Sequence, residues 1–144
     1  MQIEYLKIYR FKSINCLEIE DISQALILVG QNSTGKTTVL DAIRAVGGDY
    51  RVVPEDFDES GANIEITVRL SLCEEDLKRL QKRGKVSSYR RWESFLADVK
   101  KKLPSFDGET LTFTYIVNRD GRQRFDDGFK KNNPYLRDDF PTIY

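Results

Sequence analysis

Side chains that bind transition metals are almost missing from this chain. It contains no histidine, and its two cysteines, Cys16 and Cys73, lie far apart and form no C-x-x-C motif. Structural zinc sites need four cysteine or histidine ligands at close spacing. The sequence therefore argues against a zinc site, and we expect both thiols to stay reduced.

Excess charge and long apolar runs are missing as well. Lysine plus arginine number 23, as do aspartate plus glutamate, so the formal net charge is zero. Bulk charge therefore gives no argument for a nucleic-acid partner. No apolar run approaches the length of a membrane span, and the N-terminus does not resemble a signal peptide. We expect a cytoplasmic protein that contacts no membrane, with its 144 residues in a single domain.

The most informative segment that is present fits the phosphate-binding pattern G-x-x-x-x-G-K-[ST]. Its residues are Gly30, Gln31, Asn32, Ser33, Thr34, Gly35, Lys36, Thr37 and Thr38. The apolar run 25–29 before it is typical of a strand buried on both faces. A run that suits a helix follows Gly35, with Val39, Ile43 and Val46 on one face, and ends at the two glycines after Val46. This context favours a nucleotide-phosphate site over a glycine turn with an exposed lysine.

Each residue type in the loop suits a triphosphate. Glycines let the backbone N–H groups curl around phosphate oxygens, and the following helix directs its positive dipole end to the same place. We expect Lys36, our candidate catalytic residue, to reach the β- and γ-phosphates, and the Thr37 hydroxyl to bind Mg²⁺. Thr38 is expected to meet the α-phosphate. Asn32 could touch the γ-phosphate or an attacking water, or could instead stabilise the turn.

Alternating hydrophobicity predicts most of the remaining structure. Strands are expected over 2–11, 16–20, 63–72, 111–117 and 122–125. The strand 63–72 has one polar face, which favours antiparallel pairing. The acidic segment 49–61 could hold a second metal ion, but nothing in the sequence fixes its carboxylates on one face. We therefore favour a solvated connection for that segment.

Two helices, over 73–83 and 88–103, are expected to carry the only local concentration of positive charge. The basic residues are Lys78, Arg79, Lys82, Arg83, Lys85, Arg90, Arg91, Lys100, Lys101 and Lys102. These basic residues, within 78–102, could contact DNA phosphates by charge alone. The alternative, which we favour, is that they form a solvated helical face.

Three segments together resemble a known group of proteins. Residues 7–14, 17–19 and 28–43 resemble the N-terminus of SMC/RecF-like ABC-type ATPases, with I-x-N-F-[RK]-S and G-x-N-x-x-G-K-[ST]-[NT]-[LIV]-L-[DE]-A-[IL] as their motifs. The closest resemblance is to the OLD family of ATP-dependent endonucleases and related prokaryotic defence AAA-type ATPases. The similarity covers about the first third of the chain, and Tyr9-Arg10 replaces the usual asparagine before Phe11.

This resemblance implies an α/β fold of the P-loop NTPase class. The chain would be the N-terminal portion of an ABC-type ATPase head with a mixed, partly antiparallel sheet, spanning 1–144 with a basic helical insertion at about 73–104. The implied ligands are ATP, rather than GTP, and Mg²⁺. A basic side chain at the end of the first strand lies over the phosphates in this superfamily. Lys12 matches that position and Arg10 is a second candidate; the alternative is a solvated basic turn.

The resemblance also implies partners and a process. Two ATPase heads, or the C-terminal half of the same head, would sandwich the nucleotide. Hydrolysis would serve DNA processing, DNA repair or anti-phage defence.

The parts that hydrolyse ATP in such enzymes are not recognisable among these residues. No run of four apolar residues ends in Asp-Glu, no Ser-Gly-rich signature is present, and no histidine can act as a switch. No acidic cluster resembles a Toprim-type nuclease site. We therefore expect the N-terminal portion of a longer ATPase. The alternatives are a non-catalytic nucleotide-sensing or dimerisation module and a small P-loop kinase, which the hairpin before the loop disfavours.

Overall fold

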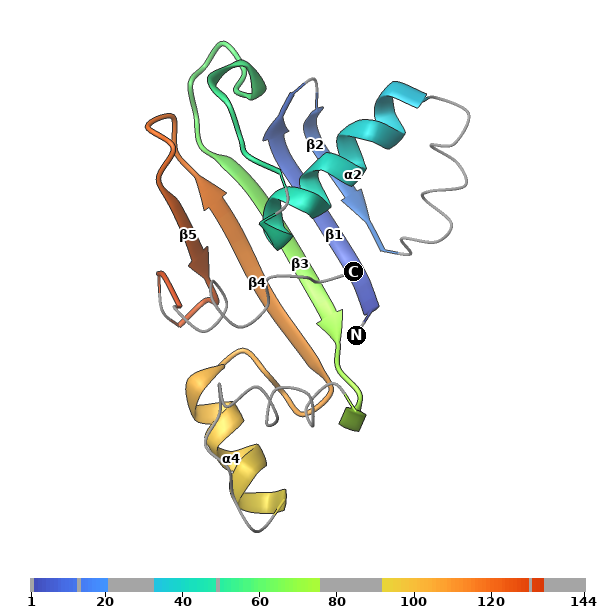
Figure 1. Ribbon diagram of the computed structural model, residues 1–144, viewed down its shortest axis with the longest axis vertical. Helices are drawn as coiled ribbons and strands as arrows, with labels where there is room; N and C mark the ends of the chain where they lie inside the picture. Colours follow the sequence, from blue (N-terminus) through green and yellow to red (C-terminus); the bar gives the residue numbers. More distant parts are fainter. Residues whose placement is uncertain are drawn as a thin grey trace.

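The computed structural model describes residues 2–12, 14–20, 33–48, 50–75, 92–129 and 131–133. Its elements are β1 (Gln2–Phe11), β2 (Ile14–Ile19), α2 (Ser33–Gly47), the 3₁₀ turn η1 (Pro54–Asp56), β3 (Ile64–Ser71), α4 (Trp92–Lys102), β4 (Thr110–Val117) and β5 (Gln123–Asp126). Figure 1 shows them as one sheet with a helix across its upper half and another at its lower end. The protein is thus a small α/β domain, as the sequence predicts.

The five strands form one sheet in the order β2-β1-β3-β4-β5, and each neighbouring pair runs antiparallel. The long central pairings place Ile8 opposite Ile66 and Val68 opposite Phe113. The expected mixed sheet depends on the segment 25–29, which lies outside the described residues. Every described strand pairing is antiparallel.

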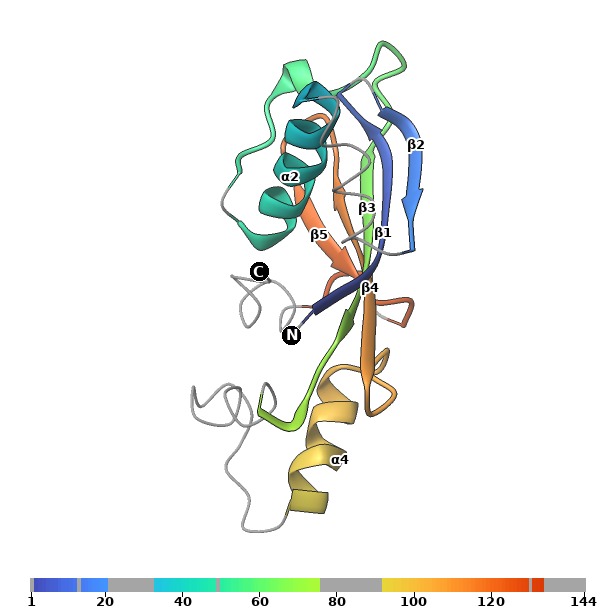
Figure 2. The same ribbon diagram turned by 90° about the vertical axis from the view of Figure 1, so that its right-hand side faces the viewer.

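One face of the sheet forms the core because apolar residues alternate along its strands. In β3 all the core-facing positions, Ile64, Ile66, Val68 and Leu70, are fully or almost fully buried, and the residues between them are half-buried. Figure 2 shows the sheet edge-on, with α2 lying across this face. The predicted apolar face of α2, formed by Val39, Ile43 and Val46, joins the same buried cluster. Burial on one face explains why strand and helix periodicities could be read from the sequence.

The second helix, α4, lies at the end of the sheet where β4 begins (Figure 1). Val99 on α4 and Leu103 just after it are buried, which confirms part of the predicted apolar face. Lys100 and Lys101 are exposed. The predicted helix over 73–83 and the beginning of the second helix fall mostly outside the described residues. Within the described part of the chain, no helix has both the length and the apolar character needed to cross a membrane.

The boundaries of the first hairpin differ from the prediction. Phe11 pairs with Ile14, so β2 begins at Ile14 rather than Cys16 and the turn is shorter than expected. The second predicted hairpin is confirmed. Its turn closes through Arg122, whose backbone N–H donates to the Asn118 side-chain oxygen at 2.9 Å.

Tyr115 on β4 is a polar group in the core, and it provides a stability test. Its side chain is 1% exposed, and its ring centroid lies 5.1 Å from that of Phe125. Within the described residues its hydroxyl has no hydrogen-bond partner. An unpaired buried hydroxyl costs about 1–3 kcal/mol. We therefore expect Tyr115→Phe to raise the free energy of unfolding by about 1 kcal/mol in urea denaturation at neutral pH.

Alkaline pH should enlarge this difference. Burial raises the pKa of Tyr115 to about 12 from 10.0, so the unfolded chain releases this proton first. The effect on stability is absent below pH 10 and grows as the pH rises towards 12. It approaches roughly 3 kcal/mol once the pH exceeds the raised pKa, since each pKa unit corresponds to about 1.36 kcal/mol. Tyr115→Phe removes the titrating hydroxyl and should not show this alkaline loss of stability. Tyr9→Phe, on the opposite face of the sheet, keeps Tyr115 and should show it. Equal alkaline losses in both variants would contradict the expectation.

Candidate functional site

The phosphate-binding loop lies partly outside the described residues. Gly30, Gln31 and Asn32 are not described, and for 33–37 the structure describes the backbone and no side chain. Helix α2 begins at Ser33, inside the motif, whereas the sequence suggested a start after Gly35. The first four N–H groups of a helix have no partner within it. In α2 these N–H groups come from the middle of the loop, around Ser33.

The charge distribution along α2 leaves its N-terminal end free of acidic side chains. The first turn contains no aspartate or glutamate, and the last turn contains Arg44. Thr38, the last residue of the loop, is buried. The first carboxylate of the helix is Asp41, which is also buried and is paired with Lys12. The positive dipole end of α2 is therefore not occupied by a carboxylate of its own first turn.

The end of β1 is bent by two residues in the left-handed region. Arg10 has a φ of 59° and Lys12 has a φ of 53°. L-residues pay roughly 1–2 kcal/mol for this conformation. The bend breaks the strand alternation, so that Phe11, rather than Arg10, continues the buried row begun by Leu6 and Ile8. The end of β1 consequently directs its two basic side chains differently.

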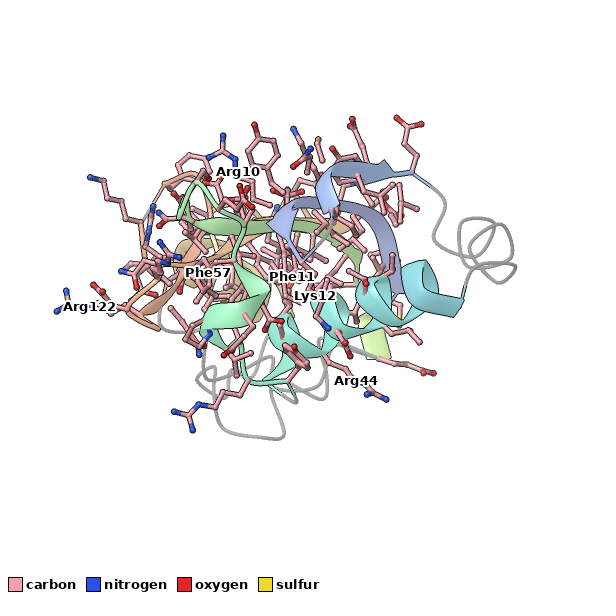
Figure 3. The ribbon with its side chains drawn as sticks, turned by 90° about the horizontal axis from the view of Figure 1, so that it is seen from above. Arg10, Phe11, Lys12, Arg44, Phe57 and Arg122 are labelled. Carbon is pink, nitrogen blue, oxygen red and sulfur yellow. The ribbon has the colours of Figure 1, made fainter. Side chains whose placement is uncertain are left out.

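Lys12 lies against α2, and Arg10 does not. Figure 3 shows Lys12 beside Phe11 over α2, with Arg10 on the opposite side of the sheet. The Arg10 guanidinium stacks 5.0 Å from the ring centroid of Tyr9. Of the two basic candidates from the sequence, the structure thus brings Lys12 to the helix that follows the loop.

The ammonium group of Lys12 is held on three sides. Its Nζ donates a hydrogen bond of 2.7 Å to Asp41 Oδ2. It also lies 5.5 Å from the ring centroid of Phe11 and 5.0 Å from that of Tyr50. The side chains of Lys12 and Asp41 are 28% and 11% exposed. Burial lowers the pKa of Lys12, but the hydrogen bonds to Asp41 and Tyr50 outweigh burial and raise this pKa above its ordinary value.

Asp56 in η1 connects this group to the backbone. Its carboxylate accepts hydrogen bonds of 2.9 and 3.0 Å from the Tyr50 hydroxyl and one of 2.9 Å from the Val53 N–H. Its carbonyl oxygen accepts a bond of 2.8 Å from the Lys12 N–H. Burial and the bond to Asp56 together raise the pKa of Tyr50. We call Phe11, Asp41, Tyr50 and Asp56 the lysine cage.

The cage corrects one prediction about the acidic segment 49–61. That segment is not solvated throughout, because Asp56 is only 4% exposed, although Glu55 and Glu59 are exposed as expected. The proline at the first position of η1 and the nearby aromatic residue were the signals for local order. Within the described residues, no three acidic or cysteine side chains form a group that could hold a metal ion.

The face of the sheet opposite α2 carries charges of both signs. Tyr5 donates to Glu18, and this hydrogen bond, with burial, raises the pKa of Tyr5 to about 12. The guanidinium of Arg69 lies 5.3 Å from the Tyr5 ring centroid and pairs with Glu4 at 3.4 Å. A shallow cavity of about 310 Å³ lies between β1 and β3, lined by Lys7, Tyr9, Glu65 and Thr67. Such a balanced face gives no preference for an anionic partner.

No protein-family model matches this chain, and no curated protein matches it either.

Proposed function

We propose that this chain binds a nucleoside triphosphate with Mg²⁺ at the loop 30–38. The observation that carries the proposal is the start of α2 at Ser33, within the motif. This start gives Lys36 and Thr37 positions at the beginning of a helix whose first turn lacks acidic residues. The N–H groups that a helix leaves without a partner at its start, together with its positive dipole end, favour a phosphate ligand at such a position.

The residues of the loop suit this ligand chemically. The backbone N–H groups of the first helical turn would bind phosphate oxygens, Lys36 would add a positive charge, and the Thr37 hydroxyl would bind Mg²⁺. Bound Mg²⁺ would neutralise and bridge phosphate oxygens. Lys12 supplies a further ammonium beside α2. ATP rather than GTP, and a contribution from Arg10, are supported by the family resemblance alone.

The wider role that we propose is that of part of an ABC-type ATPase head. A second head or a C-terminal half would complete the nucleotide site, and the process served would be DNA processing, repair or anti-phage defence, with an endonuclease as one form. The hairpin of β1 and β2 before the loop supports this assignment over a small P-loop kinase. Exposed Lys100 and Lys101 on α4 are available for a DNA contact.

Equilibrium titration tests the binding proposal. The chain is titrated with a fluorescent ATP analogue with and without Mg²⁺, and the bound analogue is then displaced with ATP, ADP and AMP. We expect saturable binding that Mg²⁺ strengthens, with displacement strongest for ATP and weakest for AMP, because the loop binds the β- and γ-phosphates. Binding that is not saturable, or equal displacement by AMP, would contradict the proposal.

The second candidate function is nucleotide binding without hydrolysis. It is favoured by a specific feature of the sequence, which has no apolar strand ending in Asp-Glu and no signature motif. Steady-state phosphate release, measured with and without DNA, separates the two functions. Turnover by this chain alone at about 1 s⁻¹ or faster, an ordinary enzyme rate, would exclude the non-catalytic module. Saturable binding without phosphate release would favour it.

A further inference from the structure

Lys12 is held more firmly than an ordinary surface lysine. Its ammonium is in contact with a carboxylate and two aromatic rings that come from α2, β1 and the segment before η1. The Asp56 carbonyl fixes its backbone N–H, although its φ of 53° is unfavourable for a lysine. A strained residue persists only where its surroundings determine it, and such residues concentrate at functional sites. The lysine cage therefore needs an explanation beyond strand packing.

The position of Asp41 on α2 suggests that explanation. Asp41 lies one helical turn after Thr37, near the middle of α2, so the pair with Lys12 places an ammonium beside the helix about one turn from the end of the loop. An ammonium has three N–H donors, and the bonds to Asp41 and Tyr50 use two of them. One donor remains for a further acceptor.

We propose that Asp41 is a positioning residue of the nucleotide site, which acts by holding Lys12 where its ammonium can reach the terminal phosphate of the bound triphosphate. Tyr50 and Asp56 support Asp41 by fixing the other side of the cage. This inference rests on the proposed function, because it assigns a role within the same site. In this proposal the preference for ATP over ADP depends on the Asp41 carboxylate, although Asp41 does not itself contact the nucleotide.

Two other roles for Asp41 give different results. If the ion pair only joins β1 to α2, Asp41→Asn lowers thermal stability and leaves the ratio of ATP to ADP affinity unchanged. If Asp41 competes with phosphate for Lys12, the variant raises that ratio because a negative charge has been removed. Positioning alone makes the ratio fall.

The test is a double-mutant cycle of Asp41→Asn and Lys12→Met, read by the affinities for ATP and ADP with Mg²⁺. We expect Asp41→Asn to lower the ratio of ATP to ADP affinity about tenfold, roughly the effect of losing one charge-assisted hydrogen bond. In the Lys12→Met background, Asp41→Asn should change the ratio no further. Glu55→Gln, which removes an exposed carboxylate from the neighbouring turn, is the matched control and should leave the ratio unchanged.

A milder variant covers the case in which Asp41→Asn does not fold. Tyr50→Phe keeps the ring beside Lys12 and removes the hydroxyl that bonds to Asp56 and to Lys12. We expect it to lower the same ratio only about two- to threefold, because the bond from Lys12 to Asp41 is retained. A wild-type chain that binds ATP, together with unchanged or raised ratios in the variants that fold, would overturn the role of Asp41 alone. A wild-type chain without ATP binding would overturn the proposed function and this inference with it.

Discussion

Lys36→Ala is expected to lower the affinity for ATP by at least about a hundredfold. Charge-assisted hydrogen bonds contribute roughly 1.5–3 kcal/mol each, and we expect this ammonium to bind two phosphates. A loss of about 3 kcal/mol corresponds to a little more than two orders of magnitude in affinity. Titration with the fluorescent ATP analogue measures the change. Far-UV circular dichroism checks that α2 is retained, since alanine favours helix at least as strongly as lysine.

A control variant at a second lysine shows whether the loss of affinity comes from the loop or from the change in net charge. Lys100→Ala removes an equal charge from an exposed position on α4, at the far end of the sheet from α2 (Figure 1). We expect its ATP affinity to match that of the wild type. If Lys36→Ala also binds ATP as the wild type does, the loop does not bind phosphate and the proposed function is wrong.

Strands and helices that bury one face could be predicted from the sequence, because their apolar residues recur with the period of the strand or helix. The predicted strand 63–72 is β3, and its apolar row, which includes Ile66 and Val68, is the buried one. The prediction succeeded because burial on one face requires an apolar residue at every second position. The apolar face of α2 could be predicted for the same reason with a helical period.

Features that depend on long-range pairing could not be predicted in this way. The sheet places β3, rather than a strand closer in the sequence, beside the free edge of β1. No local sequence pattern predicts the positive φ angles of Arg10 and Lys12, because glycine or asparagine is the usual residue in that conformation. After these residues β2 starts at Ile14, so the turn is shorter than predicted.

The candidate site shows the same division. Lys12 and Asp41 both fall at motif positions, [RK] in the first motif and [DE] in the second, but nothing in the sequence pairs them. The two residues are 29 positions apart, and only the folded chain shows their ion pair. Asp56 was one of several carboxylates in an acidic segment, and only the folded chain shows that it is buried against Tyr50. Spacing in the sequence can reveal contacts within one helix or strand. The lysine cage instead brings together residues from β1, α2 and the segment around η1.

Phe113→Ala is expected to lower the free energy of unfolding by about 3–5 kcal/mol, the usual cost of removing a buried phenylalanine side chain. Phe113 is 1% exposed, faces Val68 across the β3–β4 pair, and its ring centroid lies 5.9 Å from that of Phe125. Urea denaturation measures the loss. The matched control is Thr112→Ala, the preceding residue, which is exposed on the other face and should cost less than about 1 kcal/mol. Because a slip of one residue in register exchanges the two faces of a strand, equal losses in the two variants would mean that the β3–β4 register is wrong.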